Sequence, residues 1–149
     1  MDTEHGLDVE YYTSESMKGL PFSAAVRVGR MLYLSGQIGM DGSRKLVPGG
    51  IAAETRQAMD NIRATLDRYG SSLDHIIKAT VMLADMSEWA EMNKVYMTFF
   101  STHLPARSAM GVNGLALGAR VEIECIAVLK RTFNPLFGVP SPRPRVHNH

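Results

Sequence analysis

The last third of the chain holds the feature that most constrains its fold, a strand-like segment whose two faces differ in chemistry. Residues 119–129 alternate strictly, and one face is apolar throughout: Val121, Ile123, Cys125, Ala127 and Leu129. The other face begins with charged side chains and then becomes apolar: Arg120, Glu122, Glu124, Ile126 and Val128. A solvated sheet edge would explain the charges alone, because antiparallel sheets often leave one face wet. The change from charged to apolar side chains along this face instead suits a cleft or a subunit interface that is lined by charged groups.

A second strand-like segment begins at Pro105-Ala106-Arg107-Ser108, and a Gly-rich connection over residues 111–118 joins the two. We therefore predict a hairpin in which Arg107 lies across from Glu122. An arginine fork can bind a carboxylate through two parallel hydrogen bonds, and a glutamate can orient water or pass protons. Two alternatives carry equal weight on the sequence alone. Arg107 could form a structural ion pair with Glu122 or Glu124, and Glu122 could simply face solvent.

The rest of the chain alternates between strand and helix periodicity. Short strands are predicted at 24–28 and 31–35, with a tight turn at Gly29-Arg30 between them, and a longer strand at 75–83. Apolar side chains at helical spacing predict helices at 51–69 and 88–102. The order β-β-α-β-α-β-β indicates an α+β domain with a mixed sheet and two helices on one face. The other face has no third helix to cover it, so self-association is its natural way to be buried.

Length and composition bound the class of protein. A chain of 149 residues predicts one domain, which we place at 20–130, between a flexible N-terminal arm (1–19) and a Pro-rich C-terminal tail (131–149). The start lacks an apolar signal region and no run could span a membrane, so we expect a cytoplasmic protein. The net charge of +1 gives no footprint for nucleic acid. The single cysteine, Cys125, favours a buried hydrophobe over a nucleophile, and the histidines show no metal-ligand spacing.

Seven segments, in order, resemble the RidA/YjgF family of reactive-intermediate (enamine/imine) deaminases. Each is weak alone, but the combination is specific and covers about residues 20–130. They are Pro21-Phe22-Ser23-Ala24-Ala25-Val26, Leu34-Ser35-Gly36-Gln37-Ile38, residues 55–62 (TRQAMDNI), Lys78-Ala79-Thr80-Val81, Met92-Asn93-Lys94-Val95-Tyr96, Pro105-Ala106-Arg107-Ser108 and residues 121–128 (VEIECIAV). The resemblance implies a chorismate-mutase-like fold and a homotrimer whose sheets form a barrel, with clefts between subunits.

The resemblance also implies a reaction and a site. Such proteins hydrolyse 2-imino or 2-enamino acids to 2-oxo acids and ammonia without a cofactor. On this analogy Arg107 holds the substrate carboxylate, and Glu122 positions the attacking water and assists proton transfer. Backbone groups at Gly36, with Ser35 beside it, contact the imine end, and Asn93 forms part of the wall. Orientation and one proton relay could suffice for so easy a reaction.

Three positions depart from the family pattern. Phe22 replaces the usual tyrosine and removes a hydroxyl from the substrate site, Ala109 replaces the usual cysteine there, and Gly39 replaces the usual proline, which should loosen the loop. Two other classes of function therefore remain open. One is a non-catalytic module that binds small carboxylates through Arg107, and the other is an endoribonuclease, an activity attached to some relatives. A specialised deaminase of an aminomuconate-like intermediate is a further possibility within the leading class.

Overall fold

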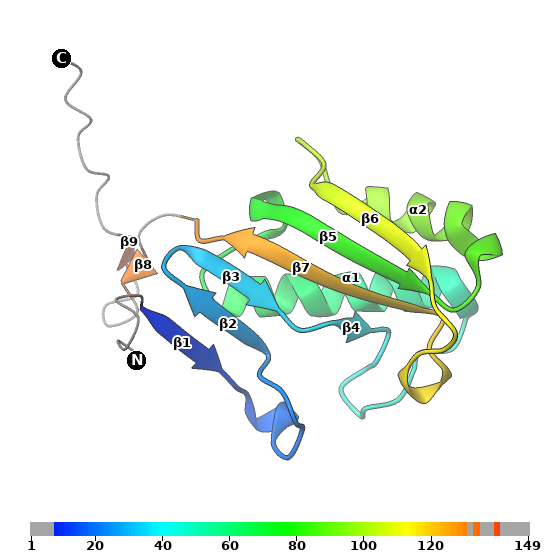
Figure 1. The fold of residues 1–149 in the computed structure, drawn as a ribbon, viewed down its shortest axis with the longest axis horizontal. Coiled ribbons are helices and arrows are strands. Elements are labelled where there is room, and N and C mark those ends of the chain that lie inside the picture. The colour runs from blue at the N-terminus through cyan, green and yellow to red at the C-terminus, as the bar shows by residue number, and fades with distance from the viewer. Residues whose placement is uncertain (1–7, 131–132, 135–138, 141–149) are drawn as a thin grey trace.

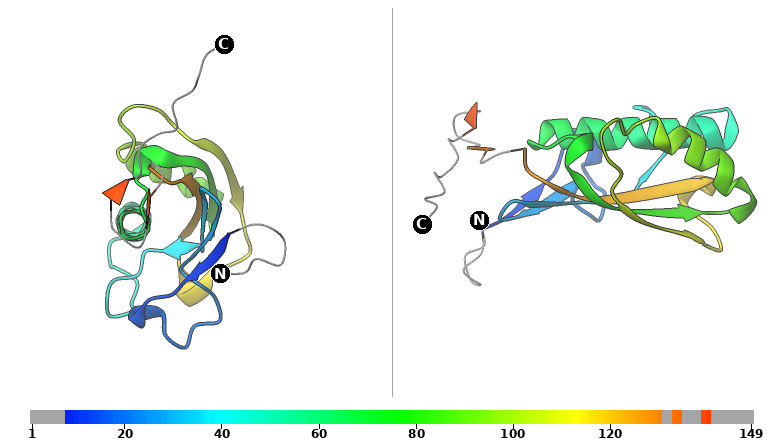
Figure 2. Two further views of the ribbon diagram at one scale, coloured as in Figure 1. Left: turned by 90° about the vertical axis from the view of Figure 1, so that its left-hand side faces the viewer. Right: turned by 90° about the horizontal axis from the view of Figure 1, so that it is seen from above.

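The chain folds into two layers, a twisted sheet and two helices that cover one of its faces (Figures 1 and 2). This computed structural model describes residues 8–130, 133–134 and 139–140. The helices are α1 (Gly50–Arg68) and α2 (Trp89–Met97). The predicted α+β class, with a mixed sheet and both helices on one face, is confirmed.

The main sheet has seven strands, and six of them follow the order β1-β2-β3-β7-β5-β6. Only the β5–β6 pair is parallel among the described pairs, and β4 extends the β3 side of the sheet by pairing with β7. The strands are β1 (Val9–Tyr12), β2 (Ala25–Val28), β3 (Met31–Leu34), β4 (Gln37–Ile38), β5 (Ile76–Leu83), β6 (Ala106–Gly111) and β7 (Val121–Val128). The predicted hairpin between residues 105–111 and 119–129 is wrong, because β5 lies between β6 and β7 (Figure 1).

The core lies between the sheet and the helices. The predicted apolar face of β7 is buried from Val121 to Leu129, and the stripe of α1 at Met59, Ile62 and Leu66 is fully buried in the same cluster. Burial raises the pKa of the Cys125 thiol to about 12, which favours the structural interpretation of that cysteine. Gly70, with a φ of 86°, comes directly after the cap residue of α1, where a glycine in the left-handed conformation commonly ends a helix.

Helix α2 is shorter than predicted, since it ends at Met97 rather than at residue 102. The hydroxyl of Thr98, the first residue after the helix, donates to the carbonyl of Val95 at 2.6 Å. Hydroxyl side chains that bond to nearby backbone groups compete with helical hydrogen bonds, which explains the early end.

The connection from α2 to β6 is tied to the residues that precede β5. The Thr102 hydroxyl donates to the Asp74 carboxylate at 3.2 Å, and the His103 ring contacts the Asp74 carbonyl at 2.7 Å. The residues after α2 therefore have a fixed place although they are not helical.

The prediction of a flexible arm over residues 1–19 is wrong for the part that the structure describes. This part contains β1, which pairs with β2 at the edge of the sheet. The Tyr12 ring at the end of β1 stacks on Tyr69 at the end of α1, with 4.2 Å between the ring centroids. This aromatic contact fixes β1 to the helical layer as well as to the sheet.

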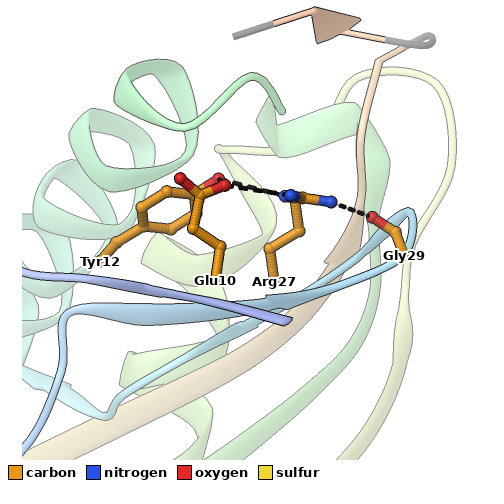
Figure 3. Close-up of polar contacts among 4 residues, drawn as sticks. All are labelled: Glu10, Tyr12, Arg27 and Gly29. Atoms are coloured by element: carbon orange, nitrogen blue, oxygen red, sulfur yellow. Dashed lines mark hydrogen bonds and ion pairs between the residues drawn. The ribbon is translucent and has the colours of Figure 1, made fainter. Parts of the chain in front are cut away.

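Polar contacts hold β1 on the sheet as well, and Figure 3 shows them. Arg27 on β2 donates to the Glu10 carboxylate at 3.0 Å, to the Tyr12 hydroxyl at 3.2 Å and to the Gly29 carbonyl at 2.9 Å. These contacts, rather than an apolar periodicity, are the reason for a strand here.

The contact between Arg27 and Glu10 predicts a pH-dependent contribution to stability. The hydrogen bond from Arg27 lowers the pKa of Glu10 below its ordinary value of 4.5. A lowered folded-state pKa stabilises the fold above pH 4.5, and this contribution is lost as the pH falls through the folded-state pKa. We expect Arg27→Met to lower the urea midpoint more at about pH 7 than at about pH 3, at fixed protein concentration. Arg63→Met, which removes an exposed ion pair with Asp60, is the control. An equal loss at both pH values would contradict the prediction.

The predicted tail, 131–149, lies outside the described residues except for two short strands. These are β8 (Phe133–Asn134) and β9 (Val139–Pro140), which pair with each other in antiparallel register. Within the described part of the chain, no helix is both long enough and apolar enough to cross a membrane.

Candidate active site

The first group of predicted site residues centres on Glu122, and we call Gly36 and Glu122 the acid half-site. Strand β4 pairs with β7 so that Ile38 lies opposite Glu122. This pairing brings the backbone of Gly36 against the carboxylate, because a Cβ added to Gly36 would collide with Glu122 Oε2 and lie 2.9 Å from its Cδ. Any side chain at position 36 would displace the carboxylate. The close approach therefore explains the glycine and leaves its backbone beside a carboxyl group.

Glu122 lies on the face of the sheet that the helices do not cover, yet it is half-buried. Burial raises the pKa of Glu122 above its ordinary value, and the charge of Glu124 on the same face raises it further. Among the described residues, no ion pair compensates the Glu122 carboxylate. A half-buried carboxyl group with a raised pKa is suited to accept and return protons.

Ser35 directly precedes Gly36 in the chain, and a hydrogen bond connects Ser35 to Ser23, the neighbour of Phe22. The Ser35 hydroxyl donates to the carbonyl of Ser23 at 2.6 Å, and the Ser35 amide donates to the carbonyl of Ala24. Ser35 therefore fixes the segment that carries Phe22, and its hydroxyl proton is already used. Phe22 is 49% exposed, so its ring is available for contact with another molecule.

The second group centres on Arg107, and we call Arg107 and Asn93 the arginine half-site. Arg107 Nη1 on β6 donates to the Asn93 side-chain oxygen on α2 at 2.6 Å. Its guanidinium also lies over the ring of Tyr96, 4.9 Å from the centroid, and over the ring of Trp89 at 5.9 Å. A cation over an aromatic ring is attracted by the ring's quadrupole. One edge of the guanidinium is thus held, and the alternative ion pair with Glu122 or Glu124 is absent from the described residues.

Tyr96 and Trp89 were not predicted as parts of this half-site. An aromatic stripe at helical spacing favours a core position for both. Tyr96, which is 3% exposed, fits that interpretation, whereas Trp89 is 43% exposed. The signal was their spacing from Asn93, since Trp89 precedes it by four residues and Tyr96 follows it by three, which places all three on one helix face. Ala109 follows Arg107 on the same face of β6 and packs at the edge of the core. It therefore lines the same strand as Arg107 without bringing a polar group.

The two half-sites do not meet within this chain. Arg107 is paired with Ala79, whose side chain is buried under the helices, whereas Glu122 points to the opposite face of the sheet. Strand β5 separates the strands that carry them (Figure 1). The predicted position of Arg107 across from Glu122 is therefore wrong, because it assumed a hairpin that the parallel β5–β6 pair replaces.

The expectation that Gly39 loosens the loop is also wrong. A Cβ added to Gly39 would lie 2.6 Å from the Cα of Glu54 and 2.7 Å from its carbonyl oxygen. The loop backbone thus touches the backbone of α1, and a residue with a Cβ would push the two apart. Glycine here permits close packing.

The chain has similar relatives among known proteins. The family model described as Endoribonuclease L-PSP matches residues 15–129. Two similar proteins, from Mus musculus and Bos taurus, are both named 2-iminobutanoate/2-iminopropanoate deaminase. The mouse protein is 47% identical over 72% of this chain and 81% of its own length, and the bovine protein is 49% identical over 72% and 80%.

Solved structures show the same fold. Yeast Mmf1 superposes with a TM-score of 0.77 at 38% identity, over 83% of this chain and 100% of the other. The YjgF gene product from E. coli superposes with a TM-score of 0.73 at 34% identity, over 80% and 98%.

Proposed function

This chain belongs to the RidA/YjgF family, and from that premise we propose that it is a deaminase of reactive 2-imino and 2-enamino acids. The observation that carries the proposal is the acid half-site, a half-buried carboxyl group with a raised pKa against the backbone of a glycine. The proteins that share 47% and 49% identity with this chain carry the name of such an enzyme.

The two half-sites divide the reaction between them. The guanidinium of Arg107 binds the substrate carboxylate through its free edge, which fixes the position of the C=N carbon. Glu122 accepts a proton from water as the water oxygen attacks that carbon, and then returns a proton to the nitrogen. This gives a carbinolamine. Glu122 then takes the proton of its hydroxyl group and passes a proton to the amine nitrogen as the C–N bond breaks, so that ammonia leaves and a 2-oxo acid remains. Orientation and a single proton relay are the two effects required of the protein.

We further propose that the site is completed between subunits of a homotrimer. Two observations support this. The half-sites point to opposite faces of one sheet, so Arg107 of one subunit has to meet Glu122 of another. The face without helices also carries exposed apolar side chains, Tyr33 on β3 and Met110 on β6, which an assembly would bury.

The experiment that tests the deaminase is an imine-trapping assay. An amino-acid oxidase generates 2-iminopropanoate or 2-iminobutanoate, and semicarbazide traps the imine that survives. We expect the protein to suppress the trapped product, because it hydrolyses the imine first. Arg63→Ala, on the exposed face of α1, should suppress trapping equally well. Unchanged trapping with both substrates would contradict the proposal and favour the carboxylate-binding module.

The name of the matching family model raises RNA cleavage as the second candidate. The net charge of +1 argues against strong binding of an RNA backbone, so we place RNA cleavage second. Degradation of RNA by the protein, lost on substitution of Glu122, would reverse the order.

A further inference from the structure

We propose that Asn61 on α1 is a positioning residue for Glu122, acting through the backbone of the loop that follows β4. The proposal rests on the assignment of Glu122 to the deaminase reaction. It concerns how the fold holds the acid half-site together, and it involves three segments that are distant in the sequence: α1, the β4 loop and β7.

Asn61 forms hydrogen bonds with the loop on both sides of Gly39. Its side-chain nitrogen donates to the carbonyl of Met40 at 2.9 Å and to the carbonyl of Ile38 at 3.3 Å. Gln57, one turn earlier on α1, donates to the Asn61 side-chain oxygen at 2.8 Å. That hydrogen bond fixes which end of the amide faces the loop, so both hydrogens of the amide nitrogen are directed at carbonyl groups.

The loop lies so close to α1 that the backbones of Gly39 and Glu54 are nearly in contact. A Cβ added to Gly39 would lie only 2.6 Å from the Cα of Glu54. Glu54 is itself 5% exposed, and its carboxylate accepts from the backbone amide of Arg120 at 2.9 Å. The same helix thus holds the β4 loop through Asn61 and the start of β7 through Glu54.

The held loop determines where Glu122 can place its carboxylate. Ile38 pairs with Glu122 across the β4–β7 ladder, and Gly36 lies two residues earlier against Glu122 Oε2. Strand β4 has only the two residues Gln37 and Ile38, so its own pairing with β7 is weak. Removing the Asn61 contacts should let β4 move away from β7. Water could then reach Glu122, and its carboxylate would no longer be held in one orientation.

Few other charges act on Glu122. Glu124 lies on the same face two residues along β7, and Arg120, two residues before Glu122, is paired with Glu88 at 2.7 Å. On β5, Met82 is opposite Glu122, and Lys78, further along the same face, donates to Ser108 on β6. Strand β4 brings Gln37 and Ile38, neither of which titrates. A variant of Asn61 should therefore change the pKa of Glu122 mainly because movement of β4 exposes the carboxyl group to water.

The test compares Asn61→Leu, Gln57→Leu and Asp60→Ala, all on α1. Asn61→Leu has a similar size and lacks both donors, and Asp60→Ala is the control because Asp60 bonds only to Arg63 among the described residues. The pKa of Glu122 is measured by carbon-13 NMR of labelled glutamate, with the signal assigned by its loss in Glu122→Gln. The values of kcat and KM for 2-iminopropanoate are measured across pH.

For Asn61→Leu we expect the Glu122 pKa and the acidic limb of the pH–rate profile to move down together. We also expect kcat to fall about 10-fold to 100-fold with KM little changed, since small displacements of a reacting group have effects of this size. Gln57→Leu should have a smaller effect in the same direction, and Asp60→Ala none. A wild-type pKa and profile in folded Asn61→Leu would overturn the proposal. A wild type without imine hydrolysis would instead overturn the proposed function, and the NMR titration would still test the role of Asn61.

Discussion

Replacing Arg107 with alanine is expected to lower kcat/KM for 2-iminopropanoate by about 100-fold or more, since hydrogen bonds to charged groups contribute about 1.5–3 kcal/mol each. The guanidinium would lose its bond to Asn93 as well as its contact with the substrate carboxylate. Arg107→Lys should recover only part of the activity, because an ammonium group cannot form two parallel bonds from a planar fork. The measurement is the initial rate of imine hydrolysis across substrate concentration.

Two controls separate the loss of chemistry from the loss of structure. Arg63→Ala removes another arginine that contacts an aromatic ring, Phe99, and should leave the rate unchanged. Circular dichroism and the oligomeric state of Arg107→Ala should match the wild type, since Arg107 is on an edge strand and only half-buried. Full activity in Arg107→Ala would contradict the assignment of the substrate carboxylate to this residue.

Much of the fold was predictable because its signals are local. The alternation of β7 predicted which residues are buried, and the α1 stripe predicted its core face. Strand order was not predictable in the same way. Residues 105–111 and 119–129 follow one another in the sequence, yet β5 inserts between them because α2 allows a parallel crossover. Strand β1 was missed because its stability comes from Arg27 and from the Tyr12–Tyr69 stack, which have no periodic pattern.

The candidate site was predictable as a set of residues but not as an arrangement. Glu122 and Arg107 were identified by their residue types on strands, and Gly36 by the resemblance to the family. The contact between Gly36 and Glu122 depends on the β4–β7 register, and the contact between Arg107 and Asn93 on how α2 packs on β6. Both depend on tertiary structure, which spacing along one chain does not specify.

The division of the site between opposite faces leads to the second prediction, which concerns mixtures of inactive subunits. Glu122→Gln keeps the size of the side chain and removes the proton acceptor, so by itself it should abolish hydrolysis, as Arg107→Ala should. In the proposed homotrimer each site takes Glu122 from one subunit and Arg107 from its neighbour. Mixing the two variants under conditions that allow subunit exchange should therefore restore activity, although neither variant is active alone.

The size of the recovery follows from counting. In an equal mixture about three quarters of the trimers contain both variants, and each of these has one intact site of three, so about a quarter of wild-type activity is expected. A site contained within one subunit predicts no recovery at any mixing ratio, because every subunit lacks one of the two groups. Recovery that follows the mixing ratio and disappears when exchange is prevented would therefore assign Arg107 and Glu122 to different subunits of one site.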